Sequence, residues 1–235
     1  MWRVNIATIF PQLFPGPLGI SCIGRKHNDS WSLTINDLKQ FSVNGRIDDE
    51  PFGGGGGMIF KPDVIDQWII ESNLQNVRKI YMSPRGKVLK QDMIEDFVKQ
   101  DICVLCGRYE GVDNRVLEHW NFEEISVGDF ILHGGEVAAM AFVEACARFL
   151  SIKPHSLNND SLKNCLLEAN NYTRPKKWLP KDSKIVYNVP EVLISGHHAK
   201  IKEWRKKSGE ALTKERRPDL YDQYKNLYVN REDNE

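Results

Sequence analysis

The sequence lacks a long apolar run and has few cysteines. No stretch approaches the ~20 consecutive apolar residues of a membrane-spanning helix, and the chain opens with a strand-like segment, Met1–Val4, in place of a signal peptide. The five cysteines are odd in number and scattered, which is typical of a reducing compartment. Because 41% of the 235 residues are apolar and 27% are charged, we expect a folded globular protein in the cytoplasm, with one large domain and a smaller one.

Familiar motifs of nucleotide and metal binding are also missing. The glycine run Gly53–Gly57 is not followed by Gly-Lys-Ser/Thr, so it is not a P-loop, and no Gly-x-Gly-x-x-Gly follows a strand. Cys103 and Cys106 fall in an expected strand, where residues three apart point to opposite faces, and His197-His198 has no nearby partner ligands. We therefore expect no metal site. The glycine run is expected to pack closely against another element or a flat base, with a plain flexible loop as the alternative.

The formal net charge is zero, but the charges are unevenly distributed. Residues 170–217 contain thirteen Lys or Arg and five Asp or Glu. A basic C-terminal module on a neutral or acidic body indicates a polyanionic partner, although a solvated helical surface has the same composition.

Apolar runs alternate with helical patterns over the first 150 residues, which predicts a parallel sheet covered on both faces. The expected strands are 4–10, 77–82, 103–106 and 124–127, and the expected helices are 63–73, 91–100, 116–120 and 137–150. Polar residues from 151 to about 168 predict a linker. Two helices are expected beyond it, at 198–207 and 218–228.

Three short loops follow successive expected strands. They are Ser83–Gly86, Gly107–Gly111 and Val127–Asp129, and the last leads through Gly134-Gly135 into an Ala-rich helix. In open α/β sheets, ligands bind beyond the carboxyl ends of the strands. Because glycine lets a backbone approach a ligand closely, we expect the three loops to form one ligand pocket.

The order of these motifs resembles the bacterial tRNA (guanine-N1-)-methyltransferase family over essentially the whole chain. The matching segments are Gly53–Met58, Ser83–Gly86, Cys106–Arg115, Ser126–Met140, Tyr172–Pro175, Val189–His198, Trp204-Arg205 and Arg216–Pro218.

The resemblance implies an α/β parallel sheet with a trefoil knot on its C-terminal side, as in the SPOUT methyltransferases, plus a small, mainly helical domain. The implied domains are 1–152 for the cofactor, a linker at 153–169, and a basic tRNA-binding domain at 170–235. The family transfers a methyl group from S-adenosyl-L-methionine to N1 of guanosine 37, directly 3′ of the anticodon, and releases S-adenosyl-L-homocysteine. It acts as a homodimer with active sites shared between chains.

Carried over by position, the resemblance also implies which residues act. The cofactor pocket would be lined by Tyr81, Met82, Ser83, Pro84, Gly86, Gly107, Arg108, Tyr109, Glu110, Val127, Gly128, Asp129, Phe130, Ile131, Leu132, Gly134 and Gly135. The tRNA-binding residues would be Arg174, Arg205, Arg216 and Arg217.

Guanine N1 carries a proton at neutral pH, so the reaction needs a general base. The family has an Asp before Tyr-Thr-Arg-Pro, and here Glu168 stands at that position, four residues before Tyr172. The side chain is one methylene longer, and we expect the backbone to compensate. Two further departures are a shorter linker, in which Lys153 is only a weak candidate for assisting the base, and Gly56 where the family commonly has proline.

Two other readings are weighed against the methyltransferase. One is a knotted methyltransferase that acts on another RNA or another guanine atom, and the C-terminal motifs argue against it. The other is a non-catalytic RNA-binding protein that keeps the cofactor loops as structure. The carboxylates Glu110, Asp129 and Glu168 argue against a purely structural role.

Overall fold

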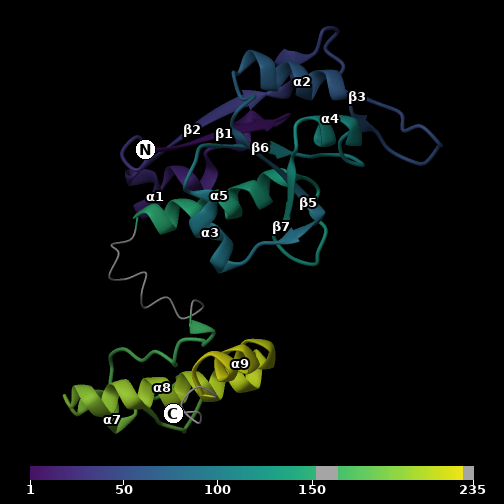
Figure 1. Ribbon diagram of the computed structural model, residues 1–235. Helices are drawn as coiled ribbons and strands as arrows, with labels where there is room; N and C mark the ends of the chain where they lie inside the picture. The colour runs from purple at the N-terminus through teal and green to yellow at the C-terminus, as the bar shows by residue number, and fades with distance from the viewer. Residues whose placement is uncertain (152–163, 230–235) are drawn as a thin grey trace. The chain divides into compact units, whose positions relative to one another are not determined.

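A five-stranded parallel sheet is the framework of the first part of the chain (Figure 1). The computed structural model describes residues 1–151 and 164–229, and the chain divides into two compact units, Met1–Lys153 and Pro154–Glu235. The sheet order is β2-β1-β6-β5-β7, and every neighbouring pair is parallel. Its strands are β1 (Trp2–Thr8), β2 (Trp31–Asp37), β5 (Arg78–Val88), β6 (Ile102–Cys106) and β7 (Glu123–Ser126). The predicted α/β parallel sheet is confirmed.

Helices cover both faces of this sheet, because alternate strand residues point to opposite sides. On one face, Ile6 and Val104 pack with residues of α3 and α5, and on the other Ala7 and Leu105 pack with α2 and α4. Figure 1 shows α1, α3 and α5 on one side and α2 and α4 on the other. The helices are α1 (Ser21–Arg25), α2 (Pro62–Glu71), α3 (Gln91–Phe97), α4 (Asn114–His119) and α5 (Gly135–Ser151), and a short ribbon joins β3 (Asp48–Asp49) to β4 (Ile59–Phe60).

The cysteines of β6 behave as the strand period predicts. Cys103 packs in the core beneath α2, whereas Cys106 packs in the core beneath α5, and both are free thiols. Burial raises the pKa of Cys103 and of Cys146 to about 12, and it raises that of Cys106 well above its usual range. Among the described residues, no group of three or more His, Cys, Asp or Glu is placed to bind a metal.

One expectation for the sheet was wrong, and one strand had no prediction. Ser83–Gly86 does not form a turn after its strand, because β5 continues to Val88 past an irregularity in its pairing with β7 between Met82 and Lys87. Pro84 has no amide to donate to a ladder, so a bulge accommodates it. The edge strand β2 was not predicted.

None of the helices in the described part of the chain combines the length and the apolar composition of a membrane span.

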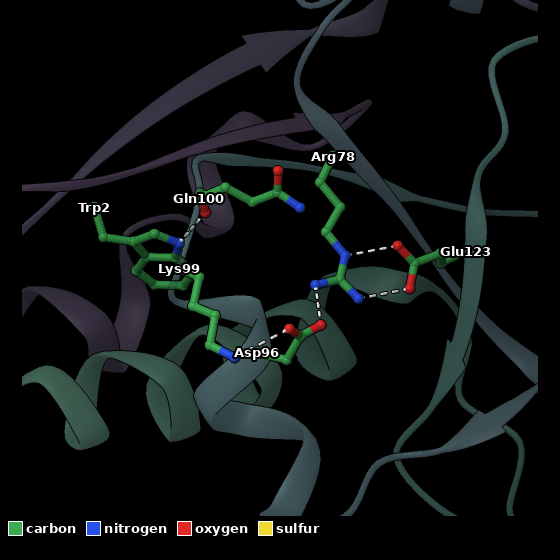
Figure 2. A network of polar contacts seen from close by, with 6 residues as sticks. All are labelled: Trp2, Arg78, Asp96, Lys99, Gln100 and Glu123. Atoms are coloured by element: carbon green, nitrogen blue, oxygen red, sulfur yellow. Dashed lines mark hydrogen bonds and ion pairs between the residues drawn. The ribbon is translucent and has the colours of Figure 1, made fainter.

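A cluster of polar contacts joins three elements at one end of the sheet (Figure 2). Arg78 of β5 donates two hydrogen bonds to the carboxylate of Glu123 in β7, at 2.6 and 2.8 Å, and one of 2.8 Å to Asp96 in α3. Its guanidinium carbon also lies 4.3 Å from the ring centroid of Phe97. The hydrogen bond from Arg78 lowers the pKa of Asp96. Nearby, Trp2 donates to the carbonyl of Gln100 at 2.9 Å.

The second unit contains a two-stranded antiparallel ribbon and helices. The ribbon is β8 (Lys177–Trp178) and β9 (Tyr187–Asn188), and the helices are α7 (Glu191–Ile194), α8 (His198–Arg216) and α9 (Pro218–Tyr224), with a π-helical turn at Lys225–Val229. The prediction that the first long helix ends at Lys207 was wrong, because Gly209 continues it and packs on the carbonyl of Leu167. Most of the expected linker, including Lys153, lies outside the described residues.

Candidate active site

The loop after β6 is held against the start of α5. The amide of Gly135 donates to the carbonyl of Gly107 at 2.8 Å, and Arg108 pairs with Gly134 in an antiparallel bridge. A Cβ on Gly135 would lie 2.9 Å from the Cα of Cys106 and from the Gly107 nitrogen. Gly135 is therefore required for the close packing of the two backbone segments, whether or not a ligand binds.

A buried carboxylate joins this loop to the end of β1. Glu136, only 1% exposed, accepts a 2.8 Å hydrogen bond from the Thr8 hydroxyl and a 2.9 Å bond from Nε of Arg108. The guanidinium carbon of Arg108 also lies 4.6 Å from the ring centroid of Phe10. Glu136 occupies the first turn of α5, where a negative charge is favoured by the helix dipole. Sequence reasoning missed Thr8 and Glu136 as site residues; a Glu directly after Gly-Gly at a helix start is the signal that was present.

The same loop is fastened to the segment that follows the glycine run. The amide of Glu110 donates to the carbonyl of Met58 at 2.9 Å, and that of Phe60 donates to the carbonyl of Gly111 at 2.9 Å. The ring of Tyr109 meets Phe60 edge-on at 5.7 Å between centroids. Together these contacts fix the loop on two sides.

The glycine run has two different surroundings. A Cβ on Gly57 would lie 2.4 Å from Cγ of Glu110, so close packing is confirmed at that end. The positions from Gly53 to Gly56 have nothing within 4 Å of an added Cβ. Gly53, Gly54, Gly55 and Gly57 all have positive φ, which favours glycine at each of them.

Tyr81 and the irregular segment of β5 form the neighbouring wall. A Cβ on Gly107 would meet the Tyr81 ring at 2.8 Å, and burial raises the pKa of the Tyr81 hydroxyl to about 12. A Cβ on Gly86 would lie 2.4 Å from the backbone of Glu124 in β7. The Ser83 hydroxyl accepts from the amide of Arg85 at 3.3 Å. Met82 is buried and Pro84 is exposed.

The segment between β7 and α5 is exposed and carries free backbone groups. The Ser126 hydroxyl donates to the Gly128 carbonyl at 3.0 Å and shapes the turn. Within the described part of the chain, the amides of Asp129, Ile131 and Leu132 donate no hydrogen bond. Free amides of this kind can donate hydrogen bonds to a ligand with polar edges, such as a nucleoside.

This segment also exposes large apolar side chains. Phe130 is 55% exposed and Ile131 81%, with Leu132 also open. Val137 in the first turn of α5 is 61% exposed, and Tyr109 in the loop after β6 is exposed as well. Side chains of this size are usually covered when they cluster on one surface.

The structure therefore brings together several of the residues expected at the pocket. Tyr81 contacts Gly107, and Gly107 contacts Gly135, so the segment of β5, the loop after β6 and the start of α5 are neighbours. Val127 and Asp129 belong to the segment that leads into α5. They form a continuous set within the first unit.

Glu168 lies in the second unit and is exposed. Its backbone is anchored by the preceding residue, because the amide of Leu167 donates to the Thr213 hydroxyl at 2.8 Å. That hydroxyl in turn donates to the carbonyl of Gly209 at 2.6 Å within α8. Among the described residues the Glu168 side chain makes no hydrogen bond or ion pair.

The expected tRNA-binding arginines differ in their surroundings. Arg174, Arg205 and Arg216 are exposed, and none of them forms an ion pair with another described residue. Arg217 is paired with Asp219 at 2.6 Å, which makes it the least available of the four. The Tyr172 ring contacts Trp204, beside Arg205, at 6.2 Å between centroids.

Comparison with known proteins supports one family. Residues 2–223 match the model of the family described as tRNA (Guanine-1)-methyltransferase TrmD. Three relatives are named tRNA (guanine-N(1)-)-methyltransferase. The protein from Ruegeria pomeroyi is 42% identical, and the alignment covers 95% of this chain and 94% of the relative. That from Neorickettsia sennetsu is 43% identical over 94% and 99%, and that from Ehrlichia canis is 44% identical over 94% and 95%.

Proposed function

The chain belongs to the tRNA (guanine-1)-methyltransferase family, and we infer from this that it is an enzyme that methylates N1 of guanine in tRNA. The observation that carries the inference is the extent of the match, which runs through both units of the chain. We propose in addition that the methyl donor is S-adenosyl-L-methionine and that the target is guanosine 37. Because tRNA is the substrate, we expect the enzyme to act in the cytoplasm.

The proposed cofactor site lies in the first unit. It consists of the irregular segment of β5, the loop after β6 and the segment that leads into α5. The donor would supply an electrophilic methyl group on sulfur. The free amides of Asp129, Ile131 and Leu132 would hydrogen-bond polar edges of the bound molecule, and Tyr81 and Tyr109 would limit the space around it. The ion pair of Arg108 with Glu136 fixes the loop, so these groups are already positioned before a ligand arrives.

Glu168 is the proposed general base. The proton on guanine N1 must leave before N1 becomes a competent nucleophile, and the carboxylate of Glu168 would accept it. The anchor of Leu167 on Thr213 holds the backbone beside Glu168 and leaves the side chain free to extend. Removing a general base costs about 10²- to 10⁴-fold in turnover.

The apolar cluster of Phe130, Ile131, Leu132 and Val137 supports a further proposal, that the enzyme is a homodimer with active sites shared between chains. A second copy would cover these side chains, which are mostly exposed in one chain. Sedimentation of the wild type should then give twice the 27.1 kDa chain mass.

The first test is transfer of a labelled methyl group from S-adenosyl-L-methionine to an unmodified tRNA transcript. A matched transcript with adenosine at position 37 is the control. Label on the guanosine transcript alone establishes substrate and site. Equal labelling of both would move the target elsewhere, and no labelling of either would favour a non-catalytic RNA-binding protein.

The base is tested with Glu168→Gln and Glu168→Asp. The Gln variant should lose at least about 100-fold in kcat, whereas the Asp variant, which keeps the carboxylate, should retain measurable turnover. Cofactor affinity should be unchanged in both. Near wild-type turnover in the Gln variant would show that Glu168 is not the base.

A further inference from the structure

The ribbon β8–β9 presents two aromatic rings on one face. Trp178 and Tyr187 are direct partners in the antiparallel pairing, so their side chains point to the same side. Their ring centroids are 5.8 Å apart with an angle of 36° between the planes. The amide of Val189 donates to the carbonyl of Lys176 at 3.0 Å and extends the ribbon by one pair.

Both rings are open to solvent. Trp178 is 56% exposed and Tyr187 is 54% exposed, and among the described residues neither strand pairs with any element but the other. Single exposed apolar side chains are common on proteins. Two large rings that lie side by side across a ribbon form an exposed aromatic surface, which is unusual when nothing covers it.

The same ribbon is strongly basic. Residues 174–189 contain Arg174, Lys176, Lys177, Lys181 and Lys184 but only one acid, Asp182. All five cations are exposed, and none forms an ion pair with another described residue. Because residues two apart on a strand share a face, Lys176 lies on the same side as Trp178. An unpaired cation therefore stands next to the aromatic pair.

We propose that this ribbon, residues 176–189, is a stacking platform for an unpaired nucleotide of the substrate tRNA, distinct from the target base. A flat aromatic face stacks on a base of any identity, and lysines beside it attract the flanking phosphates. The excess of positive charge argues for a polyanion, since an apolar protein partner does not require unpaired cations. The proposal rests on the proposed function, because it takes tRNA as the bound molecule.

The test is equilibrium binding of an unmodified tRNA transcript, without methyl donor, to wild type, Trp178→Ala and Trp178→Phe. Stacking on one aromatic side chain corresponds to roughly a fivefold to 150-fold change in affinity. We expect Trp178→Ala to bind at least about fivefold more weakly, and Trp178→Phe, which keeps a ring, to stay within about twofold. Leu179→Ala is the matched control, because Leu179 is the next residue along the chain, is 55% exposed and carries no ring.

A second pair of RNAs separates base stacking from phosphate contacts. The competitors are a stem-loop RNA and a blunt duplex with the same stem. The Trp178→Ala variant should lose affinity for the stem-loop but not for the duplex, which offers no unpaired base. Equal losses for both RNAs would overturn stacking.

Wild-type RNA affinity in Trp178→Ala would also overturn the proposal. If that variant had in addition a lower melting temperature or a changed sedimentation, protein and not RNA would cover the rings. Methyl transfer by the wild type at saturating tRNA is measured separately, so a failure of the proposed function is distinguished from a failure of this platform.

Discussion

The buried carboxylate of Glu136 gives the sharpest test of how the candidate site is held. The substitution Glu136→Gln keeps the shape and removes the charge. In the wild type the two carboxylate oxygens accept from the Thr8 hydroxyl at 2.8 Å and from Nε of Arg108 at 2.9 and 3.2 Å. A glutamine has one acceptor oxygen, so its amide group would face one of these donors.

The expected loss in the free energy of unfolding follows from the burial of Glu136 and Arg108. Breaking a fully buried ion pair costs about 3–5 kcal/mol, and a hydrogen bond to a charged group contributes about 1.5–3 kcal/mol. Arg108 keeps 21% of its side chain exposed, whereas Glu136 keeps 1%, so water recovers part of the loss. We expect the free energy of unfolding to fall by about 2–3 kcal/mol. For a chain of this length that corresponds to a lower melting temperature by about 5–10 °C.

The assay is urea unfolding followed by circular dichroism, with Asp29→Asn as the control. Asp29 forms an exposed ion pair with Lys26 at 2.7 Å, and removing such a pair changes stability by less than about 1 kcal/mol. Combining Glu136→Gln with Thr8→Val should give less than the sum of the single effects, because the two residues share a hydrogen bond. A Glu136→Gln protein that unfolds within about 0.5 kcal/mol of wild type would refute the reasoning.

Three further predictions concern packing, the polar cluster and the thiols. Gly135→Ala should lower stability by about 1–3 kcal/mol in urea unfolding, because its Cβ would lie 2.9 Å from backbone. Arg78→Lys should cost about 1–2 kcal/mol in the same assay, because lysine cannot make the two parallel bonds to Glu123. A hydrogen bond from Arg25 lowers the pKa of the exposed Cys22 thiol, so Cys22 should react fastest with iodoacetamide at pH 7 by mass spectrometry. Arg25→Gln should slow that reaction, and the three buried thiols should react only after unfolding.

The sheet was predictable because its central strands are apolar on both faces. The run Ile102–Cys106 is buried at every position, and such runs stand out in a sequence. The edge strand β2 alternates apolar Trp31, Leu33 and Ile35 with polar Ser32, Thr34 and Asn36, which is the pattern of a strand with one buried face. It was missed because only continuous apolar runs were taken as strands. The segment 83–86 has the composition of a turn, and its residues form no pairs with β7. Only the pairing of Met82 before it and Lys87 after it, both opposite Ile125, shows that the strand resumes beyond it.

The glycines of the candidate site were found from the sequence, but the reason for them was not. A glycine pair indicates close approach of the backbone without saying to what. The structure shows that Gly107, Gly134 and Gly135 lie against Tyr81, Arg108 and the backbone around Cys106. Glu136 was missed for a related reason, since its partner Thr8 is 128 residues away in sequence.

The same glycines pack the loop after β6 against α5 and lie in the proposed cofactor site. This decides which residues can be used to probe cofactor binding. A glycine variant that loses methyl transfer does not by itself show a cofactor contact, because the same Cβ disturbs the packing between the loop and α5. Asp129 is different: its side chain is exposed, so changing it has little effect on the core. Asp129→Asn should therefore weaken binding of S-adenosyl-L-methionine while leaving urea unfolding within about 0.5 kcal/mol of wild type. If this variant bound the cofactor as wild type does, the free amides of the segment, and not the Asp129 side chain, would have to account for recognition.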